Sequence, residues 1–176
     1  LYLATVLSVL VAAASVRFLF MELAQAAPGL SAHAGGWKVG FYLHVTGATV
    51  ALLVGPFQFF AALRAAFPMV HRSIGVTYVI ACLFGGSAGI YIGYHTPHGP
   101  IAAIGYMSLG TLWLASTGMG LMNILKGKIA DHRRWMVRSF ALAFAAVTLR
   151  LYLPPMFAYG VSPVMIFSIV AWLSWL

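Results

Sequence analysis

Long apolar runs alternate along the chain with short segments rich in charge, glycine and proline. The runs lack the strict apolar-polar alternation of a half-buried strand, so they predict helices. Most approach the roughly 20 residues that a helix needs to cross a hydrocarbon core about 30 Å thick. The pattern therefore predicts five full spans and a partial sixth, at about 1–23, 39–63, 73–94, 101–125, 134–153 and from 163 onward.

Prolines and glycines set the expected helix boundaries. Gly55-Pro56 lies inside the second run, where the missing backbone donor should kink the helix. Pro154-Pro155 is expected to stop the fifth helix. The stretch from Ser162 to Leu176 would be about 22 Å long at roughly 1.5 Å per residue, which is short of a full span. The whole chain, residues 1–176, is predicted to be one all-α transmembrane domain.

Composition agrees with a lipid environment. Hydrophobic residues make up 62% of the 176 positions and charged residues only 7%, too few to cover a water-soluble domain of this size. The net charge of +8 comes from Lys and Arg in short gaps between apolar runs, which argues against a nucleic-acid partner. Residues 2–23 lack a basic flank and contain Arg17, so we expect a retained helix and not a signal peptide.

The distribution of Lys and Arg predicts the orientation, because cytoplasmic loops retain an excess of these residues. Lys38 alone falls on one side of the predicted bundle. Seven cations fall on the other side: Arg64, Arg72, Lys126, Lys128, Arg133, Arg134 and Arg138. We therefore expect that side, and with it the N-terminus, to be cytoplasmic.

Small residues recur every four positions in two of the predicted helices. Gly85, Gly89 and Gly93 form one stripe, and Ser116 and Gly120 form another. Such stripes let helix backbones approach closely in lipid, so tight helix packing is the expected role. A groove that accommodates a cofactor is the alternative.

Four ionisable residues fall inside predicted spans at similar depth: Arg17, Glu22, His44 and Arg150. Ionisable groups at such positions are costly and mark candidate functional sites. Glu22 and Asp131 are the only acids in the chain, so Glu22 can neutralise one arginine but not both. The other arginine could reach the headgroups, a lipid phosphate or a partner subunit, or bind an anionic or quinone-like ligand.

Histidines in membrane helices also suggest a b-type haem, which neutral imidazoles hold in membrane cytochromes. His44 is the candidate ligand, because Gly40 and Gly47 at i−4 and i+3 leave room on its face. A second haem layer is disfavoured by spacing. His71 and His95 would lie about 36 Å apart along one helix, farther than the hydrocarbon thickness.

A cluster of His, Arg and Trp marks the expected cytoplasmic edge. Arg and Trp suit the headgroup region, so binding of anionic lipid headgroups is the simplest interpretation, and a site for an acidic partner is the alternative. The residues of this basic edge are Arg64, His71, Arg72, His132, Arg133, Arg134 and Trp135.

Several short stretches resemble the bacterial predicted membrane proteins grouped as domain of unknown function 2306, over residues 40–154. The chain has Ser73 where that family often has tryptophan. The stretches are Leu43-His44, Gly55-Pro56-Phe57-Gln58-Phe59, Leu63-Arg64, His71-Arg72-Ser73-Ile74-Gly75-Val76-Thr77-Tyr78, His132-Arg133-Arg134-Trp135-Met136, Arg138-Ser139 and Ala145-Ala146-Val147-Thr148-Leu149-Arg150-Leu151.

The resemblance implies a multi-helix domain of a bacterial inner membrane and no particular activity. It adds Gln58 to the candidate buried polar residues. The positions that define its motif are His44, Gln58, Arg64, His71, Arg72, His132, Arg133, Trp135 and Arg150.

The sequence contains no paired carboxylates, nucleophile with an adjacent base, or phosphate-cradling loop, so we expect a non-enzymatic protein. The favoured hypothesis is a small accessory subunit in a larger inner-membrane complex, such as a bioenergetic or photosynthetic one, in contact with lipid and other membrane subunits. The alternative is a redox protein that binds b-type haem through His44, or a quinone near Arg17, Glu22 and Arg150. A transporter is less well supported, because no inverted repeat is evident.

Overall fold

The computed structural model describes residues 1–21 and 38–176. Every regular element in these two ranges is a helix and none is a strand, which confirms the all-α prediction. In chain order the elements are α1 (Tyr2–Phe20), α4 (Lys38–Val54), the 3₁₀ helix η1 (Gly55–Phe59), α5 (Ala61–Ala66), α6 (Pro68–Tyr94), α7 (Pro100–Leu125), α8 (Ile129–Ala158) and α9 (Pro163–Leu173).

Several helices are long and apolar enough to cross a membrane. Four candidates are found in the described ranges: Tyr2–Phe20, Lys38–Phe59, Pro68–Tyr94 and Ile129–Ala158. Only 17% to 33% of the residues in their most apolar windows are buried inside the bundle, so apolar side chains also cover its outside. Helix α7, with 26 residues, is of comparable length but is not among these candidates. The fold is that of a multi-pass membrane protein.

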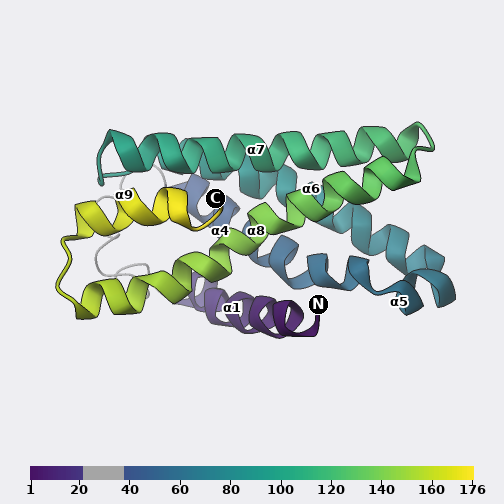
Figure 1. Ribbon diagram of the computed structural model, residues 1–176, viewed down its shortest axis with the longest axis horizontal. Helices are drawn as coiled ribbons and strands as arrows, with labels where there is room; N and C mark the ends of the chain where they lie inside the picture. The colour runs from purple at the N-terminus through teal and green to yellow at the C-terminus, as the bar shows by residue number, and fades with distance from the viewer. Residues whose placement is uncertain (22–37) are drawn as a thin grey trace.

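The helices form one bundle in which neighbours along the chain pack together. Helix α6 packs between α4 and α7, and α7 packs against α8. Helix α1 covers α4, and α9 packs against α7 and α8. Figure 1 shows the α5–α6 and α7–α8 turns at one end of the bundle and the α6–α7 and α8–α9 turns at the other. The basic edge thus gathers at a single end.

Three helix boundaries differ from the predictions. Helix α6 begins at Pro68, not near Ser73, and α8 begins at Ile129, not near Arg134. A helix can continue beyond the hydrocarbon core, so charged residues there do not end it. Proline is favoured in the first turn of a helix, which suits a start at Pro68. Helix α8 also continues through Pro154-Pro155 to Ala158, so the expected stop there is wrong. The fixed φ of proline suits a helix, and each proline removes only one backbone hydrogen bond.

The expected interruption of the second run is present. Helix α4 ends at Val54, and Gly55–Phe59 forms η1, with Pro56 in its first turn. The chain then turns into the short α5, so the break is larger than a kink. Gly55 is required there, because a Cβ would lie 2.6 Å from the ring of Phe140.

Tight packing by the glycine stripe is also confirmed. A Cβ on Gly47 of α4 would lie 2.6 Å from the backbone nitrogen of Gly85 on α6. A Cβ on Gly93 would lie 2.9 Å from the side chain of Tyr106 on α7. One face of α6 therefore meets the α4 backbone directly, and its end fits against Tyr106 Cβ and the adjoining backbone of α7.

Hydroxyl groups connect three helices in the bundle core. The Tyr78 hydroxyl of α6 lies 2.9 Å from Ser139 Oγ of α8, which lies 2.7 Å from Thr117 Oγ1 of α7. Ser139 is fully buried, and Tyr78 has 1% of its surface exposed. Interhelical hydrogen bonds of this kind hold membrane helices together in a defined register.

Candidate functional site

The side chain of His44 is held between α4 and α6. Its Nδ1 lies 2.8 Å from the carbonyl oxygen of Gly85, 41 residues away in sequence. A carbonyl can only accept, so Nδ1 carries the proton and donates it, and Nε2 keeps its lone pair. Histidines that bind metals are commonly oriented by a second hydrogen bond of this kind.

The space around His44 comes from a different glycine than the sequence suggested. Gly40 faces the ring of Tyr91, and Gly47 faces Gly85, so neither makes room for the imidazole. Gly89 of α6 does, because a Cβ there would lie 2.9 Å from His44 Nδ1. Sequence spacing within one helix could not identify a glycine that faces His44 from the neighbouring helix.

Arg150 on α8 is close to α1. Its Nη2 donates to Ser15 Oγ at 2.9 Å, and its Nη1 donates to the carbonyl oxygen of Ala146 at 2.9 Å. The guanidinium is also within electrostatic range of Arg17 and of His44. The structure therefore brings Arg17, His44 and Arg150 into one region, as expected from their depth, while Glu22 lies outside the described residues.

At the basic edge, two cations already have partners. Arg134 lies 3.3 Å from Asp131 in an exposed ion pair, and the guanidinium of Arg138 lies 4.5 Å from the centre of the Trp135 ring. Asp131 and Trp135 each lie within one turn of their arginine on α8. Arg64, Arg72 and Arg133 are exposed.

His132 and His71 occupy the same edge on facing helices. His132 Nδ1 lies 2.8 Å from the carbonyl oxygen of Gly120 on α7, and His71 is within electrostatic range of His132 and Arg64. Two turns further along each helix, Tyr78 and Ser139 bond across the same interface.

Gln58 is not brought to the region of His44 and Arg150. Its Oε1 would lie 3.3 Å from a Cβ on Gly75, ten positions and about 15 Å before Gly85 along α6. Gln58 thus belongs with the basic edge. The break at Gly55-Pro56 changes the chain direction just before Gln58, which position along the sequence could not predict.

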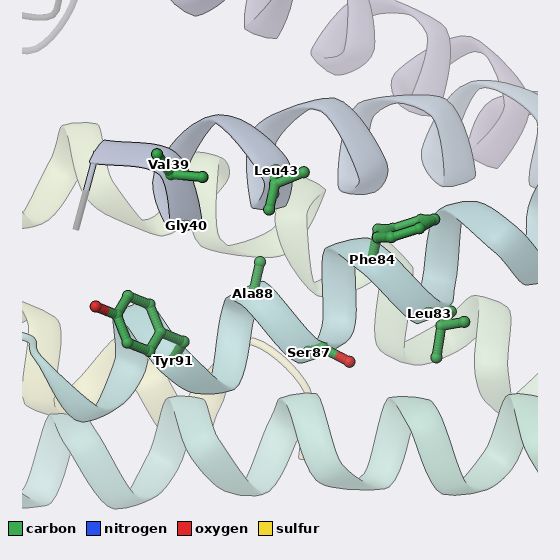
Figure 2. A pocket seen from close by; sticks show the side chains of 8 residues that line it. All are labelled: Val39, Gly40, Leu43, Leu83, Phe84, Ser87, Ala88 and Tyr91. Atoms are coloured by element: carbon green, nitrogen blue, oxygen red, sulfur yellow. The ribbon is translucent and has the colours of Figure 1, made fainter.

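A groove runs along the outside of α4 and α6 in two adjoining sections of about 520 Å³ and 300 Å³. Leu43 and Phe84 line both sections, and Thr46, Thr77 and Ser87 add hydroxyl groups. Figure 2 shows the larger section, with Val39 and Leu43 on α4 and the remaining large side chains on α6. No pattern in the sequence marks this surface, because its residues are ordinary membrane-facing types.

Sequence reasoning also missed Ser15, Gly85 and Gly89. Ser15 and the Gly85 carbonyl are hydrogen-bond partners of candidate residues, and Gly89 provides space. The glycine stripe predicts helix packing, or alternatively a cofactor groove, but gives no link to His44. Ser15 gave no signal in the sequence, because serine is ordinary in membrane helices.

Comparison with protein families matches residues 41–176 to a model described as predicted membrane protein (DUF2306). The match extends beyond the 40–154 range that carried the resemblance in the sequence. No curated protein and no solved structure matches the chain.

Proposed function

We propose that this chain, which belongs to the DUF2306 family of predicted membrane proteins, works inside the bilayer as an accessory subunit of a larger membrane complex. Its groove along α4 and α6 would seat a transmembrane helix of another polypeptide. The observation that carries the proposal is the groove itself, whose two sections adjoin at Leu43 and Phe84 and whose mainly apolar lining includes three hydroxyl residues.

Hydroxyl groups in the groove favour a helix over a lipid tail as its occupant. Thr46 and Ser87 are exposed, and no hydrogen bond to another described residue involves their hydroxyls. An acyl chain offers no hydrogen-bonding group, whereas a partner helix offers side chains and a close backbone. Small and hydroxyl residues are enriched where membrane helices meet.

Filling the groove tests this function. Ser87→Trp should release the chain from its complex, because the indole would occupy the space of the partner helix. Ile104→Trp is the matched control, since Ile104 is 56% exposed on α7 and outside the groove. Mass measurement in mild detergent of the assembly extracted from native membranes should show a second polypeptide in fixed stoichiometry, lost only with S87W. A monomer, or an assembly of this chain alone, would contradict the proposal.

The same proposal includes an orientation in a bacterial inner membrane. The basic edge would face the cytoplasm, in accordance with the positive-inside rule. In Figure 1 the N-terminus of α1 points toward the end of the bundle that carries the basic edge. We accordingly place the N-terminus in the cytoplasm as well.

A second candidate function is a redox protein that binds b-type haem or a quinone. It is favoured by the hydrogen bond from His44 Nδ1 to Gly85, which leaves Nε2 available as a ligand atom. Arg17 and Arg150 nearby would suit a reduced, anionic quinone. A visible spectrum of protein expressed with ample haem tests the haem function, and a spectrum without a Soret band would rule it out.

A further inference from the structure

Two buried polar atoms at the basic edge have no hydrogen-bond partner among the described residues. They are Nε2 of Gln58 and Nδ1 of His71. Buried polar groups are nearly always paired, because an unpaired one loses its bonds to water without compensation. Each such atom therefore calls for a partner outside the described residues.

Both side chains are associated with the same stretch of α6. Gln58 packs over Gly75, where a Cβ would be 3.3 Å from Oε1. His71 is one turn before Gly75 on the same face of α6, so positions 71 and 75 are neighbours on the face that Gln58 covers. Any side chain at position 75 would crowd Gln58, so the glycine preserves the space that the amide occupies.

The surroundings are rich in donors and positive charge. Arg64 on α5 and His132 on α8 are within electrostatic range of His71. The carboxylate at this edge, Asp131, already pairs with Arg134. A ligand that satisfies these groups must bring acceptor oxygens and negative charge. A quinone carbonyl would supply acceptor oxygens but no negative charge.

We propose that Gln58, His71 and Arg64 bind a phosphate group at the basic edge. Its oxygens would accept from the amide of Gln58 and the imidazole of His71, with Arg64 supplying the charge-assisted bond. The phosphate can belong to an anionic phospholipid or to a soluble molecule. The inference is independent of the groove on α4 and α6, which is lined by other residues.

Titration of the full chain in neutral detergent tests the site and distinguishes the two sources. The probes are short-chain phosphatidylglycerol, inorganic phosphate, and diacylglycerol as a phosphate-free control. Native mass spectrometry should show one bound phosphatidylglycerol and no specifically bound diacylglycerol. Saturable binding of inorganic phosphate without the lipid would support the same site with a soluble ligand.

Variants separate a built site from general attraction to a positive surface. Gln58→Leu changes no charge and should weaken phosphate binding about tenfold, the usual effect of losing one hydrogen bond to a charged group. Gln58→Glu keeps the shape and should weaken binding further by repulsion. Arg64→Gln should also weaken binding, whereas the control Lys126→Gln, which removes one positive charge at an exposed position of the same end outside the basic edge, should alter it less than about twofold.

The proposal is overturned if neither probe binds, or if the variants Q58L and Q58E retain the affinity of the unaltered chain. Equal losses in R64Q and K126Q would also overturn it, because they would indicate only nonspecific attraction. A thermal melt of each variant confirms that it is folded before binding is compared.

Discussion

At the residue scale, the hydroxyl chain in the core has a defined direction. Thr117 donates its single hydroxyl hydrogen to the carbonyl oxygen of Trp113 at 2.8 Å, so it must accept from Ser139. Ser139 then accepts from Tyr78. Each hydroxyl donates once, and Ser139 is the link that joins α6 to α7.

Ser139→Ala should therefore destabilise the bundle by about 1 to 2 kcal/mol, because the buried Tyr78 hydroxyl loses its acceptor. Ser73→Ala is the control, since Ser73 lies exposed on α6 and its hydroxyl makes no hydrogen bond to a described residue. Reversible unfolding in mixed micelles measures both changes. If S139A and S73A unfold with the same free energy, the hydroxyl chain contributes nothing to stability.

At the element scale, the crossing of α4 and α6 depends on two glycines in direct contact. Backbone atoms cannot move aside as a flexible side chain can. A Cβ on Gly85 would lie 2.9 Å from the nitrogen of Ala48, just as one on Gly47 would meet the α6 backbone. The same crossing positions His44 on the Gly85 carbonyl, so packing and the candidate site are coupled.

Gly47→Ala should separate the two helices and cost about 1 to 3 kcal/mol of unfolding free energy, the range for overpacking a fitted interface. Gly118→Ala is a matched control, because a Cβ on that α7 glycine would meet no atom within 4 Å. The control should be neutral or slightly stabilising, since alanine is the better helix former. Thermal unfolding in detergent compares the two, and equal stability of G47A and G118A would refute the contact.

Element boundaries show where local patterns fail. Apolar runs predicted the helices, but the ends of α6 and α8 extend beyond the apolar residues. Hydropathy reports which residues lie in hydrocarbon, whereas a helix ends where its backbone hydrogen bonding ends. This distinction explains why Pro68, Ile129 and Ala158 were not predicted as boundaries.

At the scale of the whole molecule, the basic turns lie at one end of the bundle, which makes the orientation testable with single cysteines (Figure 1). Cys82 is the only native cysteine and has no exposed surface, so it should not react with a thiol reagent. Lys126→Cys and Tyr94→Cys place a reporter at opposite ends of the bundle, each at an exposed position.

In intact cells, a membrane-impermeant maleimide should label Y94C and leave K126C unlabelled until the membrane is permeabilised. This result follows from retention of the basic edge in the cytoplasm. The unaltered chain, which contains only Cys82, serves as the background control. Labelling of K126C in intact cells would reverse the proposed orientation.

The sequence by itself determined the class of the protein and predicted the depth of its polar residues. A long apolar run specifies a helix in lipid, because a helix satisfies all of its backbone hydrogen bonds within the segment. The positions of Lys and Arg between the apolar runs assigned most of them to one end of the bundle. The positions of Arg17, His44 and Arg150 within their runs placed these residues at one predicted depth.

Only the tertiary structure decided which groups face each other. It paired His44 with Gly85, Arg150 with Ser15, and Gln58 with the region around His71. These pairs depend on helix rotation and on the break at Gly55-Pro56, which arise from packing between segments distant in sequence. A membrane sequence fixes depth through hydropathy, but it leaves rotation about each helix axis to the fit of neighbouring surfaces.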